Sequence, residues 1–151
     1  MDPQLTPYLT FNGKAAEAMR FYQSVLGGEL TIQTFGEAKM ARTPAENDLV
    51  VHAVLKNDGL TFMASDAMTS QQANVGDSVH MNISGQDSAR LTMIFDGLPS
   101  GWRVDMPLAE WFWGDTYGQL TAKFGIHWII NITSQPQQWA GDLAPSHLGT
   151  W

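Results

Sequence analysis

The chain has 151 residues, of which 44% are hydrophobic, so it is long enough to bury one core, and no apolar run approaches the length that spans a bilayer. It carries 15 acidic against 8 basic residues, a formal net charge of −7, and lacks a Lys/Arg cluster, which argues against nucleic-acid binding. The absence of cysteine excludes thiol catalysis, disulfides and zinc–thiolate sites. No cationic, apolar leader is recognisable, so we expect a cytoplasmic protein with no membrane partner.

The first half of the chain, from Tyr8 to Asp66, predicts a strand, a helix and then three strands. Residues 7–12 form the predicted strand, and apolar residues then recur at helical spacing from Ala15 until two glycines, Gly27 and Gly28, stop the helix. Farther on, the turn at 57–59 divides two β-rich runs, which is typical of a hairpin. Two longer connections, 37–49 and 67–78, either cover a cavity mouth or are solvated loops.

The second half, from His80 to Thr133, repeats this order. Its matching segments are a strand at 80–84, an N-cap at Asp87, a helix at 89–95 that stops between Gly97 and Gly101, and a hairpin of 117–123 and 126–131 around Phe124-Gly125. A repeat of whole motifs narrows the fold more than any single segment does. We therefore predict an α+β fold with two tandem βαβββ modules.

These modules define the predicted domain organisation. Module 1 covers about residues 5–66 and module 2 about residues 79–133, and both belong to a single domain spanning 1–151. After Thr133 the chain turns polar and contains proline, so residues 134–151 are predicted to form a tail that is loose or lies across a neighbouring surface.

The densest aromatic stretch, residues 110–118, precedes a predicted strand. Because neighbouring residues of a strand point to opposite faces, we predict that Trp111 and Trp113 share one face and Phe112 takes the other. With Tyr117, this indole pair lines a ligand cup, or it packs an interface between modules or subunits.

The histidines are the candidate chemical groups, and they have functional and structural interpretations. His80 shares one side of its predicted strand with Asn82 and Ser84, where an imidazole either accepts a proton or binds a ligand, or is simply satisfied by polar neighbours. Both interpretations also stay open for His52, whereas His127, between Ile126 and Trp128, is interpreted as a packed histidine.

Several segments resemble the glyoxalase/bleomycin resistance superfamily, also called the vicinal oxygen chelate superfamily, and within it the PhnB-like branch. They are residues 7–13, Phe21-Tyr22, 26–28, His52-Ala53, 63–66, 112–115, Tyr117-Gly118, Phe124-Gly125 and Trp128. The resemblance implies cupped mixed sheets, usually in a homodimer, with a cavity in each cup and often a divalent metal. Members of this branch often carry the name of a demethylubiquinone methyltransferase, but the chain has no Gly-rich strand-to-helix loop for the methyl donor.

Whether this chain can hold the family's metal ion can be checked at each ligand position. Carried over from the family, the four ligand positions fall at Pro7, Met63, His80 and Ile129, of which only His80 can bind a divalent ion. Side chains outside the pattern that could assist it are His52, Asp66, Glu110, Asp115 and His127. The resemblance therefore implies that the usual metal site is incomplete, and the catalytic residue is unknown, with His80 as the candidate.

Two functional classes remain. In the first, the protein binds a small, partly apolar molecule in an aromatic-lined cup, without metal or other cofactor. The candidate ligand-binding residues are His52, His80, Asn82, Trp111, Trp113 and Tyr117. The alternative is a divalent-metal-dependent lyase, isomerase or dioxygenase-like enzyme, in which His80 is a base or the sole retained ligand. A third possibility is a dimeric interaction partner with a vestigial cavity.

Overall fold

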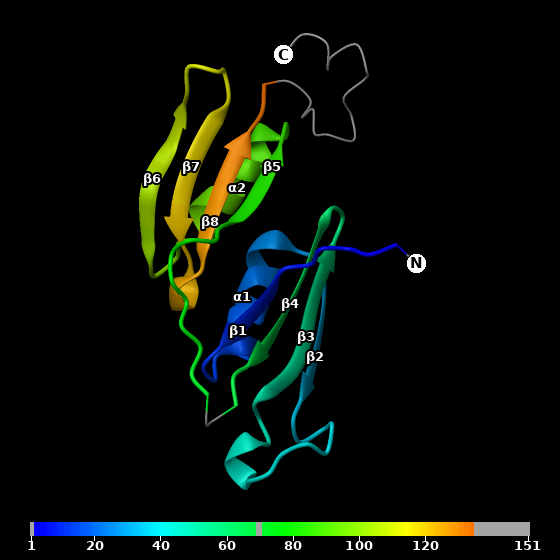
Figure 1. Ribbon diagram of the computed structural model, residues 1–151. Helices are drawn as coiled ribbons and strands as arrows, with labels where there is room; N and C mark the ends of the chain where they lie inside the picture. The colour runs from blue at the N-terminus through cyan, green and yellow to red at the C-terminus, as the bar shows by residue number, and fades with distance from the viewer. Residues whose placement is uncertain (1, 69–70, 135–151) are drawn as a thin grey trace.

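The computed structural model of the protein describes residues 2–68 and 71–134, and both modules have the predicted order (Figure 1). Module 1 consists of β1 (Tyr8–Phe11), α1 (Ala15–Leu26), β2 (Glu29–Thr34), the 3₁₀ turn η1 (Pro44–Glu46), β3 (Val50–Asn57) and β4 (Leu60–Asp66). Module 2 consists of β5 (Met81–Gly85), α2 (Ser88–Gly97), β6 (Arg103–Glu110), β7 (Thr116–Thr121), η2 (Lys123–Gly125) and β8 (His127–Ile132). Apart from Ser134, the predicted tail lies outside the described residues.

Each module contains one four-stranded mixed sheet. The strand orders are β1-β4-β3-β2 and β5-β8-β7-β6. The β1–β4 and β5–β8 pairs are parallel, and the remaining pairs are antiparallel. The predicted α+β fold with tandem βαβββ modules is therefore confirmed, and the order of strands within the sheet is the same in both modules.

One hydrophobic core joins the two modules. Helix α1 turns its apolar stripe inward, and Trp128 of module 2 packs on Tyr22 and Phe62 of module 1, with ring centroids 5.2 and 5.9 Å apart. The Trp128 indole N–H donates to the Tyr22 hydroxyl at 3.3 Å. Burial raises the pKa of Tyr22 far above its ordinary value, and the hydrogen bond from Trp128 offsets this only in part. The sheets thus share a buried side, and we call their opposite sides the open faces.

The connection between β7 and β8 differs from the tight hairpin that the sequence predicted. Strand β7 ends at Thr121 rather than at residue 123, because the chain enters the turn η2, in which Phe124 adopts a left-handed φ of 64°. The Ala122 N–H closes this loop by donating to the Ile126 carbonyl at 2.8 Å. The repeat of the module 1 hairpin therefore holds for the two strands, but the turn between them differs in type from the turn at 57–59.

Candidate functional site

The open face of module 2 gathers neutral polar side chains from three neighbouring strands, β5, β8 and β7. Because side chains alternate along a strand, the buried residues Ile83, Ile130 and Leu120 place their neighbours on the open face. The ladder registers then form the rows Ser84–Asn131–Tyr117, Asn82–Ile129–Gln119 and, beyond the start of β5, His80–His127–Thr121. We call this set the neutral face.

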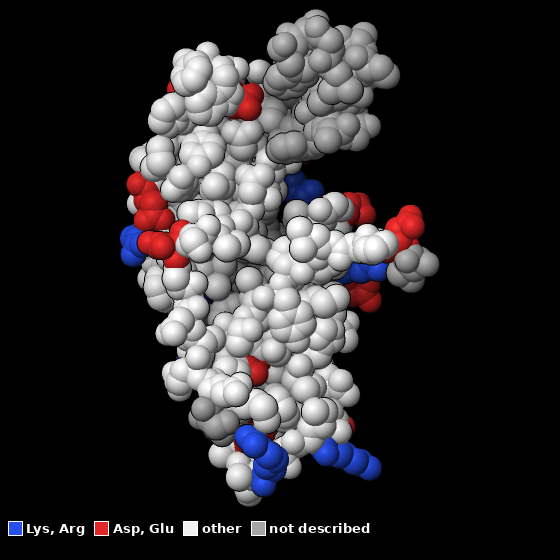
Figure 2. Space-filling view, viewed as in Figure 1, with Lys and Arg blue, Asp and Glu red and all other residues white. Residues whose placement is uncertain are grey.

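Hydrogen bonds between side chains hold the amides of the neutral face in place. Asn82 donates to the Ser84 hydroxyl at 2.8 Å, and Gln119 donates to the Tyr117 hydroxyl at 2.7 Å. In Figure 2, charged side chains are sparse over the middle of the visible surface and lie mainly along its outline. The residues of the neutral face carry no carboxylate, ammonium or guanidinium group of their own, although Thr121 and Asn131 donate to the neighbouring carboxylates of Asp105 and Asp115.

The aromatic stretch forms the hairpin turn between β6 and β7. The prediction that Trp111 to Trp113 alternate as a strand is wrong, because β6 ends at Glu110 and the Gly114 N–H donates back to the Trp111 carbonyl at 2.8 Å. The turn nevertheless brings the two indoles together, stacked at 5.5 Å with an interplanar angle of 14°. The Trp111 ring also meets Tyr117 edge to face at 6.3 Å, so the cluster borders the neutral face.

Within the described residues, this aromatic cluster leaves two rings exposed to solvent and one buried hydrogen-bond donor without an acceptor. The side chains of Phe112 and Trp113 are 94% and 50% exposed. The indole Nε1 of Trp111 is buried and has no hydrogen-bond acceptor among the described residues. A buried donor without an acceptor costs about 1–3 kcal/mol, so this end of the face is not optimised for stability alone.

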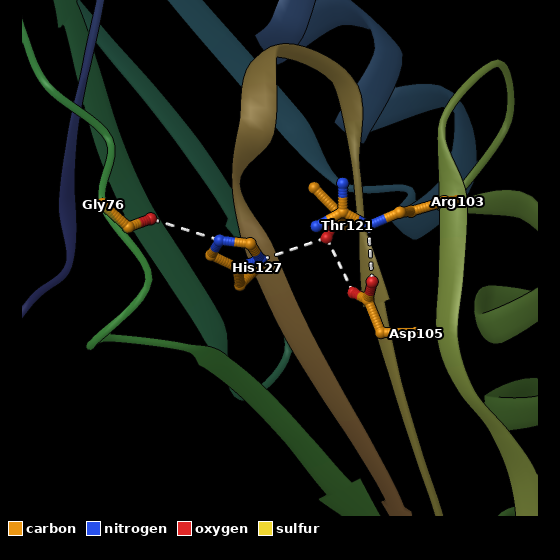
Figure 3. A network of polar contacts seen from close by, with 5 residues as sticks. All are labelled: Gly76, Arg103, Asp105, Thr121 and His127. Carbon is orange, nitrogen blue, oxygen red and sulfur yellow. Dashed lines mark hydrogen bonds and ion pairs between the residues drawn. The ribbon is translucent and has the colours of Figure 1, made fainter.

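His127 is fixed by polar contacts at both ring nitrogens (Figure 3). Its Nδ1 lies 3.0 Å from the Thr121 hydroxyl, which donates to Asp105 at 2.7 Å, and its Nε2 lies 3.1 Å from the Gly76 carbonyl of the linker between the modules. Burial alone would raise the pKa of Asp105, but hydrogen bonds from Arg103 and Thr121 and the nearby positive charge lower it overall. His127 thus anchors the linker to β8.

The residues predicted to bind a ligand lie in three separate places of the structure. His80 and Asn82 border a cavity of about 300 Å³ at the seam of the modules, while Trp111, Trp113 and Tyr117 lie at the far end of the neutral face. His52 is on the open face of module 1, where its Nδ1 lies 3.4 Å from the Tyr8 hydroxyl. One copy of the chain does not bring all of the predicted ligand-binding residues together.

Several members of the neutral face are not among the residues predicted from the sequence, namely Gln119, Thr121 and Asn131. Alternation along the strand could have found the first two, since they follow Tyr117 at intervals of two residues. No local signal identifies Asn131 as a neighbour of Tyr117, because that pairing depends on the register between β7 and β8.

The residues at the family's metal positions do not fit a divalent ion. Met63 and Ile129 lie on the open faces but offer no hard donor. Asp66 is buried and accepts hydrogen bonds from the Ala15 and Val50 amides, and Asp115 accepts one from Asn131. Across residues 2–68 and 71–134, no three His, Asp or Glu side chains come close enough to hold a metal.

Comparison with known proteins gives a family and a fold. Residues 3–131 match the model of the 3-demethylubiquinone-9 3-methyltransferase family. The chain is 34% identical to Protein YjdN of Escherichia coli strain K12 over 142 residues, 87% of this chain and 96% of that protein. The structure of PA1353 from Pseudomonas aeruginosa is 32% identical with a TM-score of 0.77, covering 87% of this chain and 98% of that one.

Two solved structures connect this family to the wider fold. A putative 3-demethylubiquinone-9 3-methyltransferase, PhnB protein, from Bacillus cereus is 24% identical, with a TM-score of 0.69 over 87% of this chain and 100% of its own. A member of the glyoxalase/bleomycin resistance protein/dioxygenase superfamily from Sphaerobacter thermophilus is 13% identical, with a TM-score of 0.54 over 87% and 98% of the two chains. These likenesses confirm the predicted fold. Within the described ranges, neither helix is long and apolar enough to cross a membrane.

Proposed function

This chain belongs to the 3-demethylubiquinone-9 3-methyltransferase family, the PhnB-like branch of the glyoxalase/bleomycin resistance superfamily, and from that premise we propose that it binds a small, partly apolar molecule without a metal ion. The observation that carries this proposal is the neutral face, where amide, hydroxyl and imidazole groups adjoin stacked indoles. Such a surface suits a ligand with a flat or aliphatic body and a few uncharged polar atoms.

The activity in the family's name is not carried over. The connection from β1 to α1 is Asn12-Gly-Lys14, with one glycine, and that from β5 to α2 is Gln86-Asp87. Neither is a Gly-rich loop of the kind that cradles a nucleotide-like methyl donor at a helix N-terminus. Binding, rather than methyl transfer, is the function that these residues support.

The aromatic end supplies the contacts that we assign to the ligand. The half-exposed ring of Trp113 provides a stacking surface, and the Trp111 N–H is a donor that a ligand acceptor would satisfy after a small movement of the turn. Tyr117, Gln119 and Asn131 would orient the polar atoms. At the other end, His80 and Asn82 extend the same face.

The proposed active form is a cytoplasmic homodimer. Both helices of the described residues contribute to the core on the buried side of the sheets, and the candidate residue His52 lies on a different sheet from the other candidates. A second copy that covers the open faces would enclose a ligand between them. Light scattering after size exclusion should give twice the chain mass.

A neutral, partly apolar dye tests the binding proposal. We expect Nile red to bind the metal-stripped protein with a change in its emission, and Trp113→Ala to weaken binding about tenfold through loss of a stacking surface. Trp102→Ala is the matched control, since that side chain is 46% exposed but lies outside the neutral face. Equal affinities of the two folded variants would contradict the proposed site.

Metal content tests the metal-free part of the proposal. Elemental mass spectrometry of the purified protein and calorimetric titration with Ni, Zn, Mn and Fe(II) should show no stoichiometric metal. Stoichiometric metal that disappears in His80→Ala would instead support the metal-dependent enzyme.

A further inference from the structure

Strand β5 is an edge of its sheet, and we propose that this edge is a docking site for an extended peptide segment of a partner protein with apolar and basic residues. Among the described strands, β5 pairs only with β8. An exposed edge presents a row of unpaired main-chain groups, which an extended peptide can use as a template for one more strand.

The register identifies which main-chain groups are available. The Gly85 carbonyl accepts from the Thr133 N–H at 2.8 Å, so the main-chain N–H and C=O groups of Gly85 point toward β8. Because successive residues of a strand direct their N–H and C=O groups to opposite sides, Ile83 and Met81 also face β8. The N–H and C=O groups of Asn82 and Ser84 therefore face outward, four groups that match the two-residue repeat of an added strand.

The two edges of this sheet differ in how they resist such pairing. Strand β6, the opposite edge, carries Arg103, Asp105, Pro107 and Glu110, and its register with β7 is broken twice. Charges, proline and register irregularities are the devices that keep edge strands from pairing with other chains. Strand β5, Met81–Gly85, has no charge, no proline and an unbroken register. Among the described residues, the edge of β5 therefore carries none of these devices.

Two cavities follow the edge of β5 and give the peptide its side-chain pockets. The first, of about 300 Å³, is lined largely by apolar side chains, including Leu60, Phe62, Met81 and Trp128. The second, of about 220 Å³, shares Leu60 with the first and continues past the end of β5 to Arg90. Both lie between β5 and the β3–β4 turn, so a peptide along the edge would direct alternate side chains into them.

Charge favours a basic residue in the second cavity. Its lining includes two acidic residues, Asp58 and Asp87, and one basic residue, Arg90, whose guanidinium donates to the Leu26 carbonyl at 3.4 Å. No ion pair among the described residues involves Asp58. The first cavity would take a large apolar side chain and the second a Lys or Arg, which also agrees with the net charge of −7.

The test uses the full chain and a library of seven-residue peptides, each with a central large apolar residue and a Lys or Arg farther along. We expect the best peptide to bind with a Kd on the order of 10 µM by fluorescence polarisation. N-methylation of alternate peptide amides should abolish binding, while methylation of the intervening amides should be tolerated. A library without any binder below 1 mM, or no alternation, would overturn the proposal.

Substitutions in the protein, rather than in the peptide, test the same contacts. Ser84→Pro removes an outward N–H, a change that edge strands tolerate, and should weaken binding at least tenfold, whereas Ser84→Ala should change it less than twofold. If Ser84→Pro does not fold, binding of the N-methylated peptides to the wild-type protein tests the main-chain contacts instead. Asp58→Asn should weaken binding about threefold to tenfold. Asp48→Asn, in an exposed loop of module 1, is its control and should have no effect.

Hydrogen exchange on the full chain distinguishes other occupants. Without peptide, the Asn82 and Ser84 amides should exchange rapidly, and peptide should slow both while leaving the Met81, Ile83 and Gly85 amides unchanged. Slow exchange at these two amides without peptide would overturn the proposal, because the edge would already be occupied. A dependence on protein concentration would then identify a second copy, and no such dependence would indicate another segment of the same chain.

Discussion

Modules 1 and 2 share a strand order but secure the start of their helices differently. In module 1, Lys14 precedes α1 without a side-chain cap, and the buried carboxylate of Asp66 accepts from the Ala15 N–H and the Val50 N–H, both at 2.9 Å. In module 2, Asp87 caps α2 locally by accepting from the Arg90 N–H at 3.1 Å. One anchor is remote and buried, and the other is adjacent and exposed.

The difference follows from one position of the repeat. Asp66 lies opposite Phe11 in the β1–β4 ladder, and Ile132 lies opposite Gly85 in the equivalent β5–β8 ladder. The side chain of Ile132 cannot accept a hydrogen bond, so in module 2 the start of α2 is capped by the adjacent Asp87 instead. The comparison teaches that a duplicated fold preserves strand order and register while the hydrogen bonds that fix each helix diverge.

The largest expected effect tests this contrast directly. Asp66→Ala leaves two buried N–H groups without acceptors and should lower the free energy of unfolding by about 4 kcal/mol, against about 1 kcal/mol for Asp87→Ala. Urea denaturation of both variants measures the two losses. Similar losses would show that the remote and local anchors are energetically equivalent.

A second contrast concerns the space beneath each helix. Gly118 and Ala53 occupy the same ladder position of their modules, opposite Ile130 and Ala64. A Cβ on Gly118 would lie 2.6 Å from the ring of Phe95, so Gly118→Ala should cost about 2 kcal/mol through overpacking. Ala53→Gly, the reverse change in module 1, should cost about 1 kcal/mol, chiefly through backbone entropy. Thermal unfolding of both variants compares them, and a neutral Gly118→Ala would mean that Phe95 can move aside.

Tyr22 of α1 and Phe95 of α2 occupy equivalent positions of the two helices, but only Tyr22 carries a hydroxyl. Tyr22→Phe leaves the buried Trp128 N–H without its acceptor and should cost about 1.5 kcal/mol at neutral pH. Because the folded pKa of Tyr22 lies above its unfolded value, its contribution is complete below about pH 10 and is lost as pH rises through the folded pKa. Denaturation from pH 8 to 11 should therefore show a steeper loss in the wild type than in Tyr22→Phe. Equal slopes would contradict the assignment to Tyr22.

The smallest expected effect lies on the protected edge strand of module 2. Arg103 pairs with Asp105 at 2.6 Å, but its side chain is 64% exposed, so Arg103→Ala should cost only about 0.5 kcal/mol. The variant should also raise the pKa of Asp105 toward its ordinary value. Since that pKa is lowered in the folded state, the stabilisation exists above the unfolded pKa and is lost as pH falls through the folded one. An NMR titration of the carboxyl carbon measures the shift, and an unchanged pKa would assign the effect to Thr121 instead.

The sequence by itself determined the repeat, the order of the elements and much of the local detail. Gly27, with φ 75°, follows the last residue of α1, and Asp87 caps α2, both as predicted, because each depends on residues near in sequence. The metal positions came from the resemblance to the family, and at those positions the sequence shows only that the side chains of Pro7, Met63 and Ile129 lack hard donors.

Only the tertiary structure decided which distant groups meet. The bond from Asp66 to Ala15 crosses 51 residues, and the bond from Trp128 to Tyr22 crosses 106. The stacking of Trp111 on Trp113 depends on where β6 ends, which the alternation rule did not reveal. Periodicity and capping are local properties of the chain, whereas register and contacts between modules arise when the whole core packs, so no short segment contains them.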